Sequence, residues 1–334
     1  MVPLSILDLA PIVVGGTATE ALNRSLDLAQ HAERWGYKRF WVAEHHNMAG
    51  IASSATSVLI AHLAAGTTTI RVGAGGVMLP NHSPLVIAEQ FGTLAALYGD
   101  RIDLGLGRAP GTDQLTMRAL RSDPLSSDRF PQDVVELRAL LGDPQPGQRL
   151  HAIPGEGTNV PLWILGSSLF GARLAAMLGL PYAFAAHFAP DALLPALRLY
   201  RAEFEASEQL AQPYVMVAAN GIAADTDNQA RWLFTSVQQR FTDMVRGQTG
   251  QLGPPLDIDT YWTPAERPHV ERMLARSFVG SPATVAAGLA DYVAETQADE
   301  MIVASAIHDH AARLRSYELL AAQAGQASTA SVGR

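Results

Sequence analysis

The chain has 334 residues, of which 48% are apolar and 17% are charged. This composition supplies enough apolar surface for a sizeable core and excludes a disordered chain. A formal net charge of -8, without a basic cluster, argues against a nucleic-acid partner. The sequence contains no cysteine, which excludes disulfides, thiolate metal sites and iron–sulfur clusters. We therefore expect a cytoplasmic protein.

Two apolar stretches could be read as a signal peptide or as a membrane-spanning helix. The first, residues 1–16, lacks a basic segment and contains Asp8, so it predicts a strand rather than a signal peptide. The second, residues 47–70, is uncharged and long enough to span a bilayer. It holds nine Asn, Ser, Thr and His residues, which indicates a buried helix of a soluble protein. No membrane partner is expected.

Short apolar or β-branched runs alternate with longer helical patterns along the whole chain, which predicts a parallel α/β fold. The predicted strands cover residues 4–9, 39–43, 70–77, 102–106, 162–166, 182–186, 215–223 and 301–304. Helical patterns at 19–35 and 84–98 end at Gly36 and Gly99, as expected for glycine past a helix end. Eight such units predict one (β/α)8 TIM-barrel domain over residues 1–334, with insertions.

Two stretches without a steady period are the expected insertions. Residues 142–161 are rich in Gly and Pro and are expected to wrap the side of the barrel. Residues 248–269 combine Gly and Pro with Leu, Tyr and Trp, and we expect a mobile loop over an active site. In such a barrel, functional groups follow the carboxyl ends of the strands.

A cluster of ionisable residues, Glu44, His45 and His46, follows the second predicted strand. In extended backbone His45 and His46 point to opposite faces, so they cannot easily bind one metal ion together. One imidazole can face the barrel mouth as a general acid or base, because histidine titrates near neutral pH. A hydrogen-bonded structural pair is the other interpretation, and the residues leave both open.

Glycines dominate the end of the third predicted strand, at Gly73, Gly75 and Gly76. Without side chains, this backbone can approach a flat or phosphorylated ligand closely. A bulge or a tight barrel corner is the alternative. Ser83 and Pro84 then suit the N-cap and the first position of the next helix.

Two further segments favour an anion. Arg108 follows the glycine-rich end of the fourth predicted strand, and its guanidinium group suits a phosphate, although a plain surface arginine is possible. Gly166, Ser167 and Ser168 lead from the fifth strand into a helix, where hydroxyls and backbone N–H groups form an anion site or an ordinary N-cap. Arg108 and this loop could bind one phosphate between them.

More histidines follow later strands. His187 follows the sixth predicted strand, and His308 and His310 follow the eighth. The last two, with Asp8, could bind the metal ion of a hydrolase. Asp309 instead fits the N-cap of a helix, and we expect no metal site.

Taken together, these segments resemble the bacterial luciferase-like flavin-dependent monooxygenase superfamily, especially its alkanal-monooxygenase-like group. The resemblance runs nearly from end to end. Its motifs are LDLAP at 7–11, AEHHN at 43–47, residues 73–84, RIDLGLGR at 101–108, LGSS at 165–168, GLP at 179–181, FVGSP at 278–282 and RLRSYE at 313–318.

The resemblance implies a (β/α)8 barrel with FMN at its mouth, where reduced FMN and O2 form a C4a-peroxy adduct that oxygenates a small organic substrate. It matches His45 to the catalytic histidine, the Ala74–Gly75 pair to a non-prolyl cis peptide under the flavin, and Arg108 to the phosphate-binding arginine. The residues expected at the cofactor are Leu9, Ala74, Gly75, Gly76, Arg108, Gly166, Ser167, Ser168 and His187.

The resemblance also implies partners. A separate NAD(P)H:flavin reductase would supply the reduced FMN, and a homodimer would pack through the helices that start near Ser53 and Pro84. Light-emitting members carry a reactive cysteine near Gly107 and an acidic residue at Ser167, so light emission is not expected. The alternatives are an F420-dependent hydride-transfer oxidoreductase and a flavin-binding protein without catalysis.

Overall fold

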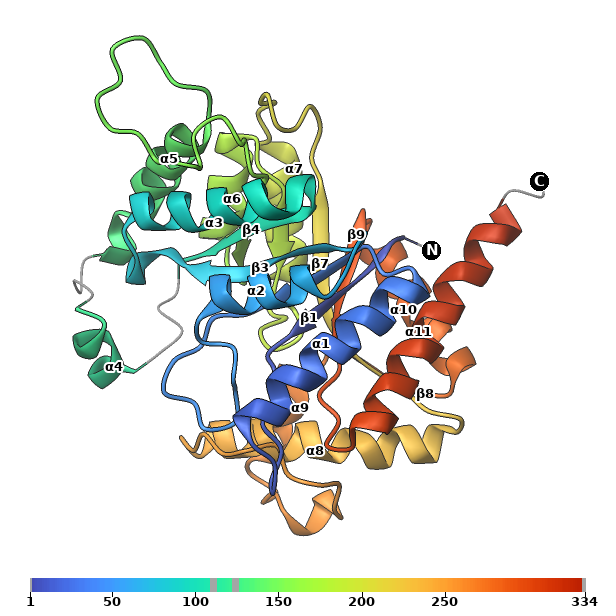
Figure 1. Cartoon of the computed structure of the whole chain (residues 1–334). Coiled ribbons are helices and arrows are strands. Elements are labelled where there is room, and N and C mark those ends of the chain that lie inside the picture. The colour runs from blue at the N-terminus through green and yellow to red at the C-terminus, as the bar shows by residue number, and fades with distance from the viewer. Residues whose placement is uncertain (1, 109–112, 122–125, 332–334) are drawn as a thin grey trace.

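Eight parallel strands close into a barrel surrounded by helices (Figure 1). The computed structural model describes residues 2–108, 113–121 and 126–331. The barrel strands are β1 (Leu4–Asp8), β2 (Arg39–Val42), β3 (Arg71–Met78), β4 (Ile102–Gly107), β5 (Leu162–Gly166), β6 (Tyr182–Phe184), β7 (Val215–Ala223) and β9 (Glu300–Ala304). Each pairs in parallel with its barrel neighbours, β6 with β7 and β9 with β1 included. The predicted (β/α)8 TIM barrel is confirmed.

Helices connect the strands and cover the outside of the barrel. They are α1 (Ala18–Trp35), α2 (Thr56–Ala65), α3 (Pro84–Tyr98), α4 (Gln114–Ala119), α5 (Phe130–Leu141), α6 (Leu169–Leu178), α7 (Leu193–Ala202), α8 (Asp227–Val245), α9 (Arg267–Met273), α10 (Pro282–Thr296) and α11 (His310–Ser331). Short 3-10 turns lie at Leu79–Asn81, Gly99–Arg101, Ser126–Asp128 and Ile258–Thr260. Among the described residues, no helix has both the length and the apolarity needed to cross a membrane.

The helices begin and end close to the predicted residues, because capping residues, proline and glycine stand at their ends. At α1, Thr17 and Glu20 form a capping box, in which each side chain accepts a hydrogen bond from the backbone N–H of the other residue. Gly36 ends the helix in a left-handed conformation at φ 81°, which costs glycine little. Pro84 begins α3, where a missing N–H carries no penalty.

The sequence analysis missed one strand. β8 (Ser277–Gly280) pairs with the second half of β7, from Asn220 to Ala223, and extends the sheet beyond the barrel. Its four residues lie directly between two helices, and such a short run carries too little alternation to be recognised. The sixth predicted strand also ends earlier than expected, at Phe184.

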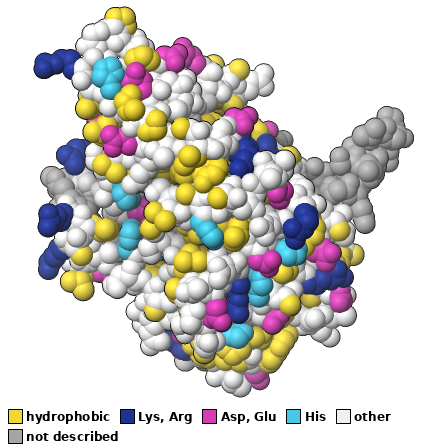
Figure 2. All heavy atoms as spheres, viewed as in Figure 1, with side chains coloured by type: hydrophobic (Ala, Val, Ile, Leu, Met, Phe, Trp, Pro, Cys, Tyr) yellow, Lys and Arg dark blue, Asp and Glu magenta, His cyan; other side chains and the backbone are white. Residues whose placement is uncertain are grey.

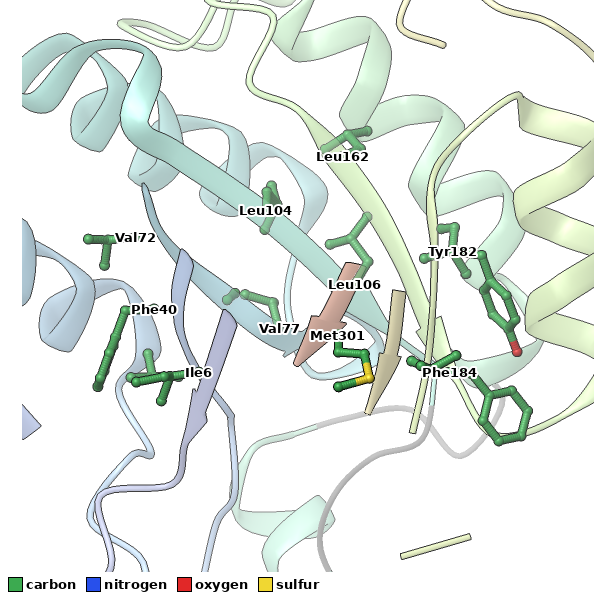
Figure 3. Close-up of a cluster of buried hydrophobic side chains, with 14 of the residues drawn as sticks. Ile6, Phe40, Val72, Val77, Leu104, Leu106, Leu162, Tyr182, Phe184 and Met301 are labelled. Carbon is green, nitrogen blue, oxygen red and sulfur yellow. The ribbon is translucent and has the colours of Figure 1, made fainter. Parts of the chain in front are cut away.

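Successive residues of each strand face opposite sides of the barrel wall. Figure 3 shows the outward set, which packs against the helices: Ile6, Phe40, Val72, Leu104, Leu162 and Met301 are among its members. The inward set forms a separate cluster that includes Leu7, Trp41, Trp163, Met216 and Ile302. Because the two sets alternate, the inward residues of each strand can be followed from its first residue to its last.

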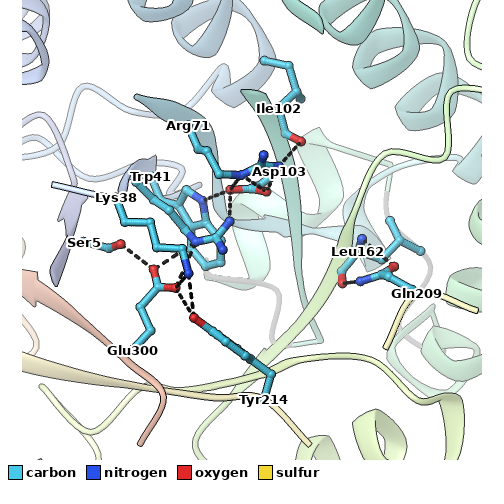
Figure 4. A network of polar contacts seen from close by, with 11 residues as sticks. Ser5, Lys38, Trp41, Arg71, Ile102, Asp103, Leu162, Gln209, Tyr214 and Glu300 are labelled. Carbon is cyan, nitrogen blue, oxygen red and sulfur yellow. Dashed lines mark hydrogen bonds and ion pairs between the residues drawn. The ribbon is translucent and has the colours of Figure 1, made fainter. Parts of the chain in front are cut away.

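The inward residues at the strand starts form a buried charged network, which we call the floor (Figure 4). Arg39 donates hydrogen bonds to Asp103 at 2.6 Å and to Glu300 at 2.9 Å, and both carboxylates are fully buried. The guanidinium group of Arg39 also lies 4.8 Å from the centre of the Trp163 ring. The other floor residues are Ser5, Lys38, Arg71 and Tyr214. These paired charges close the barrel at this end.

Candidate active site at the barrel mouth

Toward the carboxyl ends of the strands, the inward residues become small. Trp41 and Trp163 pack edge to face with their ring centres 5.1 Å apart, just above the floor. The next inward positions are small on six strands, at Ala43, Gly75, Gly105, Ala185, Ala218 and Ala304, and are leucine on β1 and β5, at Leu9 and Leu165. Gly75, Ala185 and Ala304 are partly exposed to solvent, whereas the outward residues beside them are buried. The inward side chains therefore change from bulky near the floor to mostly small toward the mouth.

His45 and His187 lie at this mouth. His45 lies three residues after Val42, the last residue of β2, and His187 lies in the turn that follows Phe184, the last residue of β6. Both rings are half-buried. Both residues follow strands whose carboxyl ends form the mouth.

His187 is held in place by its neighbours. The side-chain amide of Asn220, on β7, donates a 2.7 Å hydrogen bond to the backbone carbonyl of His187. The imidazole packs edge-on against Phe188, with ring centres 4.9 Å apart. Burial, and next the charge of His45, lower the pKa of His187 to about 4. His187 is therefore neutral at physiological pH.

His46 points away from the mouth into a different cluster. Its Nε2 lies 2.9 Å from Glu44 Oε1, and Nε2 of His82 lies 2.9 Å from the same oxygen. The N–H of Met78 donates to the other oxygen of Glu44 at 3.0 Å. Burial alone raises the pKa of Glu44, but the hydrogen bonds from His82, His46 and Met78 outweigh it and hold the pKa below its ordinary value. The structural interpretation therefore applies to His46.

The Glu44 cluster was not predicted, because Glu44 and His82 are far apart in the sequence. It borders a cavity of about 340 Å³ that is also lined by residues of α2 and α3. A second cavity, of about 350 Å³, lies between α8, α9 and β8. Ser277 lines this second cavity, and its Oγ accepts a 3.2 Å hydrogen bond from Asn220. The second cavity therefore adjoins the residue that anchors His187.

The glycines of β3 form an irregular step in the wall of the mouth. Ala74 pairs with Leu104 and Val77 pairs with Leu106, so Gly75 and Gly76 together face the single residue Gly105 of β4. The cis peptide expected at Ala74–Gly75 is instead Gly75–Gly76, and that prediction was wrong by one residue. The reason is that Ala74 stays in register with both neighbouring strands, which leaves only the two glycines out of the ladder.

Space explains why glycine occupies these positions. A Cβ atom on Gly76 would lie 2.7 Å from the carbonyl oxygen of Gly105, and one on Gly75 would lie 2.8 Å from Leu7 Cδ1. Both distances are shorter than real side-chain contacts. Bare backbone therefore faces the mouth at this step. Leu9, another expected cofactor contact, lies half-buried at the inward cluster of the barrel.

Arg108 and the start of α6 lie side by side. The guanidinium carbon of Arg108 is 4.2 Å from the centre of the Phe170 ring, and Phe170 belongs to the first turn of α6. Ser168 is the N-cap in extended backbone, and its side chain makes no capping hydrogen bond. The first N–H groups of α6 are thus not satisfied by the Ser168 side chain. An exposed guanidinium beside a helix N-terminus can bind a phosphate group.

The residues of the metal alternative do not converge. Asp8 accepts hydrogen bonds from Arg313 at 2.7 Å and from the Ser25 hydroxyl, so its carboxylate is already paired. His310 pairs with Asp27, and Nε2 of His308 lies 3.3 Å from the carbonyl oxygen of Val14. The part of the chain that the structure describes contains no group of ligands arranged for a metal ion.

The stretch 248–269 contacts the loops that follow β1 and β2, and its role as a loop over the active site stays a prediction. Most of it is irregular, but it contains the turn Ile258–Thr260 and the first residues of α9. Leu252 forms a β-bridge with Val13, and its N–H donates to the Ile12 carbonyl at 2.9 Å. A Cβ atom on Gly50 would lie 2.1 Å from the Gly250 carbonyl oxygen. This strap, residues 250–252, therefore joins the loops that follow β1 and β2, and its mobility stays a prediction.

The fold is a (β/α)8 barrel with mostly small inward residues, two histidines and an exposed arginine at the carboxyl ends of its strands. Residues 2–300 match the family model described as luciferase-like monooxygenase, and the chain belongs to this family.

Individual relatives agree with this assignment. The chain is 57% identical over 320 residues to a luciferase-like monooxygenase of Escherichia coli strain K12, covering 95% of this chain and 96% of the relative. The solved structure of apo-MsnO8 is 40% identical and superposes with a TM-score of 0.89, covering 97% of this chain and 98% of that chain. A more distant structure shows the fold alone: the oxygenating constituent of 3,6-diketocamphane monooxygenase from Pseudomonas putida, in complex with FMN, has 17% identity and a TM-score of 0.70 over 96% of each chain.

Proposed function

We propose that this protein is a flavin-dependent monooxygenase that uses reduced FMN and O2 to oxygenate a small organic substrate. The observation that carries the proposal is the change along the barrel interior, from Trp41 and Trp163 near the floor to Gly75, Gly105 and Ala304 at the mouth. A flat ring system needs such bare walls, and a histidine beside them supplies proton transfer. Membership of the monooxygenase family supports the same reaction class.

The residues at the mouth fit FMN. Arg108 and the N–H groups at the start of α6, with Gly166, Ser167 and Ser168, would hold the phosphate. Leu9, Ala74, Gly75 and Gly76 would support the ring. When bound, reduced FMN supplies the electrons that activate O2.

The residues of the protein would supply proton transfer, exclusion of water and room for the substrate. His45 would donate or accept one proton at the reacting oxygen, because it follows β2 at the mouth and histidine titrates near neutral pH. The apolar inward residues Leu7, Leu9 and Leu165 exclude water from the ring side of the mouth. The cavity beside Ser277 offers room for the body of a substrate next to the mouth.

An anaerobic titration tests this function. The purified protein is titrated with FMN, with reduced FMN and with F420, and the reduced complex is then mixed rapidly with oxygenated buffer. We expect tight binding of reduced FMN and a transient absorbing oxygen adduct. Preference for F420 would transfer the proposal to hydride transfer, and tight flavin binding without oxygen uptake in the presence of substrates would indicate a binding protein without catalysis.

The same proposal includes a homodimer in the cytoplasm, served by a separate flavin reductase. Apolar side chains gather over α2 and α3 on the face drawn in Figure 2, where Val58 and Leu97 are 69% and 65% exposed. Monomeric proteins rarely leave such a patch uncovered. Sedimentation velocity should show a dimer for the wild-type protein and a monomer for Val58→Glu. A wild-type monomer would contradict this part of the proposal.

A further inference from the structure

Three aromatic residues form a continuous chain of ring contacts through the interior of the barrel. Trp41 and Trp163 pack edge to face with ring centres 5.1 Å apart, and Trp163 packs in the same way against Tyr214, with ring centres 5.6 Å apart. Rings at these distances are in contact. Tryptophan and tyrosine are the most easily oxidised aromatic side chains, and single electrons pass rapidly between touching rings. The three residues therefore form a path for single electrons.

The two ends of this aromatic chain lie at opposite ends of the barrel. A Cβ atom on Gly75 would lie 3.1 Å from Cβ and 3.2 Å from Cε3 of Trp41, so Trp41 contacts the bare backbone that faces the mouth. Trp41 itself is fully buried. Tyr214 directly precedes β7 at the floor and is half-buried, beside Lys38, whose side chain is 35% exposed (Figure 4). The aromatic chain thus connects the mouth to the solvent-facing side of the floor.

Both end residues donate a hydrogen bond to a buried carboxylate. Trp41 Nε1 donates to Asp103 Oδ2 at 3.1 Å, and the Tyr214 hydroxyl donates to Glu300 Oε2 at 2.8 Å. Burial, and next the charge of Glu300, raise the pKa of Tyr214 above its ordinary value, so the phenol keeps its proton before oxidation. An oxidised phenol is a far stronger acid than a carboxylic acid. The hydrogen bond to Glu300 therefore gives the proton of oxidised Tyr214 an acceptor already in place.

The charges around the aromatic chain favour the tyrosine as its end point. The guanidinium group of Arg39 lies 4.8 Å from the centre of the Trp163 ring and opposes a positive charge that stays on that ring. Arg39 is paired with Asp103 and Glu300, which offsets part of this opposition. Oxidised Tyr214 carries no such penalty, because the transfer of its proton to Glu300 leaves the ring neutral.

We propose that Trp41, Trp163 and Tyr214 deliver single electrons to the mouth and so protect the site from one-electron oxidants derived from O2. The proposal rests on the proposed function, because the activation of O2 at the mouth is the source of these oxidants. The path itself is a property of the protein without a cofactor. It also gives the charged floor a second role beside closing the barrel.

Each electron and proton in this step has a defined place. The oxidant takes one electron from Trp41 and is reduced by it; Trp163 refills Trp41, and Tyr214 refills Trp163. Tyr214 then passes its phenolic proton to Glu300 and becomes a neutral tyrosyl radical. A small-molecule thiol or ascorbate at the floor returns one electron to Tyr214, and the proton moves back from Glu300. The aromatic chain ends in its starting state.

The first test follows the electrons directly and needs no flavin. The chain has no cysteine, so Ala304→Cys gives a single attachment point at the mouth for a ruthenium photo-oxidant. A laser flash in the presence of a soluble electron acceptor oxidises the label, and transient absorption distinguishes tryptophan radicals from tyrosyl radicals. We expect a tryptophan radical that decays as a tyrosyl radical forms.

Variants of the labelled protein locate the path. Trp163→Phe removes its middle, and the tyrosyl signal should be lost; Tyr214→Phe removes its end, and the tryptophan radical should persist. Trp262→Phe, at a buried tryptophan in a different cluster, is the matched control and should leave both signals unchanged. A missing tyrosyl radical in the labelled parent, or a full tyrosyl yield in Trp163→Phe, would overturn the proposal. Circular dichroism checks folding, and Tyr214→Phe tests the path from its other end if Trp163→Phe does not fold.

The second test measures protection when reduced FMN and O2 are supplied without substrate. Peptide mass spectrometry follows the oxidation of residues at the mouth, His45 and His187 among them. We expect oxidised residues to accumulate faster in Trp163→Phe than in Trp262→Phe, because the electron path is broken in the first variant alone. Equal accumulation in the two variants would reject the protective role.

The path and the proposed function fail separately. Radical transfer from the label to Tyr214, in a protein that shows no oxygen uptake with reduced FMN and substrates, would keep the path and reject the monooxygenase function. Oxygenation of substrates by a protein that forms no tyrosyl radical would keep the function and reject the path.

Discussion

The floor and the mouth of the barrel are built on the same strands and yet have opposite physical character. At the floor, Arg39, Asp103 and Glu300 pair with one another and are almost fully buried. At the mouth, most inward positions of the same strands carry glycine or alanine, and His187 keeps an unpaired ring nitrogen. We therefore expect the free energy of unfolding to depend mainly on the floor, and ligand affinity to depend mainly on the mouth. Substitutions at the two ends should therefore affect different measurements.

The largest effect is expected at the floor. Asp103→Asn removes the carboxylate that pairs with both Arg39 and Arg71. Breaking a buried ion pair from one side costs about 3–5 kcal/mol, because the remaining charge is left buried. Denaturant unfolding should show this loss, with the flavin affinity of the folded fraction unchanged. Arg71→Lys, at the more exposed arginine, is the milder control. Equal stability of Asp103→Asn and wild type would contradict the role of the floor.

The next effect is the pH dependence of stability caused by His187. Its folded-state pKa is lowered to about 4, so below pH 6.5 the unfolded chain binds a proton that the folded chain does not. Stability is fully present above pH 6.5 and is lost progressively as the pH falls to 4, by up to about 3 kcal/mol. His187→Gln should flatten the curve in this window. Parallel stability curves for the two proteins would show that His187 titrates normally.

Arg108 tests the phosphate end of the mouth. Arg108→Ala removes an exposed guanidinium that stacks on Phe170, so stability should change by less than about 0.5 kcal/mol. FMN affinity should fall by about 10- to 100-fold, the value of a charge-assisted hydrogen bond. Riboflavin, which lacks the phosphate, is the matched ligand and should bind equally to both proteins. Equal losses for FMN and riboflavin would place Arg108 elsewhere in recognition.

The smallest effect on ligand affinity is expected from a larger side chain among the small inward residues of the mouth. Ala304→Leu adds a side chain where the inward wall is partly exposed, and we expect FMN affinity to fall about tenfold with stability within about 1 kcal/mol of wild type. Ala219→Leu adds the same atoms on the outward, fully buried side of β7. It should cost about 1–3 kcal/mol of stability through overpacking and leave affinity unchanged. Calorimetric binding and thermal unfolding of both variants check the contrast.

Much of the fold could be predicted, because alternation and helix ends are local signals. Thr17, Gly36 and Pro84 act within one or two turns of their own helices. β8 was missed because its four residues pair only with the far half of β7, which is a tertiary event. The cis peptide was misplaced by one residue, since the register of Ala74 depends on two neighbouring strands.

The candidate site residues could be predicted from the sequence where they directly follow a strand. Sequence position indicated His45, Arg108 and His187, because each follows a strand. It gave no sign of the hydrogen bonds from His82 to Glu44 or from Asn220 to His187, which join distant segments. Asn220 lies inside a predicted strand, and an inward polar residue in a buried strand was the available signal.

The strap at residues 250–252 determines how the mouth can open. The backbone of Leu252 is hydrogen-bonded to Ile12 and Val14, and a side chain at Gly50 would collide with the backbone of Gly250. An outward movement of this segment would have to break both hydrogen bonds or carry the loop after β1 with it. If the mouth opens on this side, we expect the rate of opening to depend on these backbone contacts, and a change at Leu252 or Gly50 to alter it.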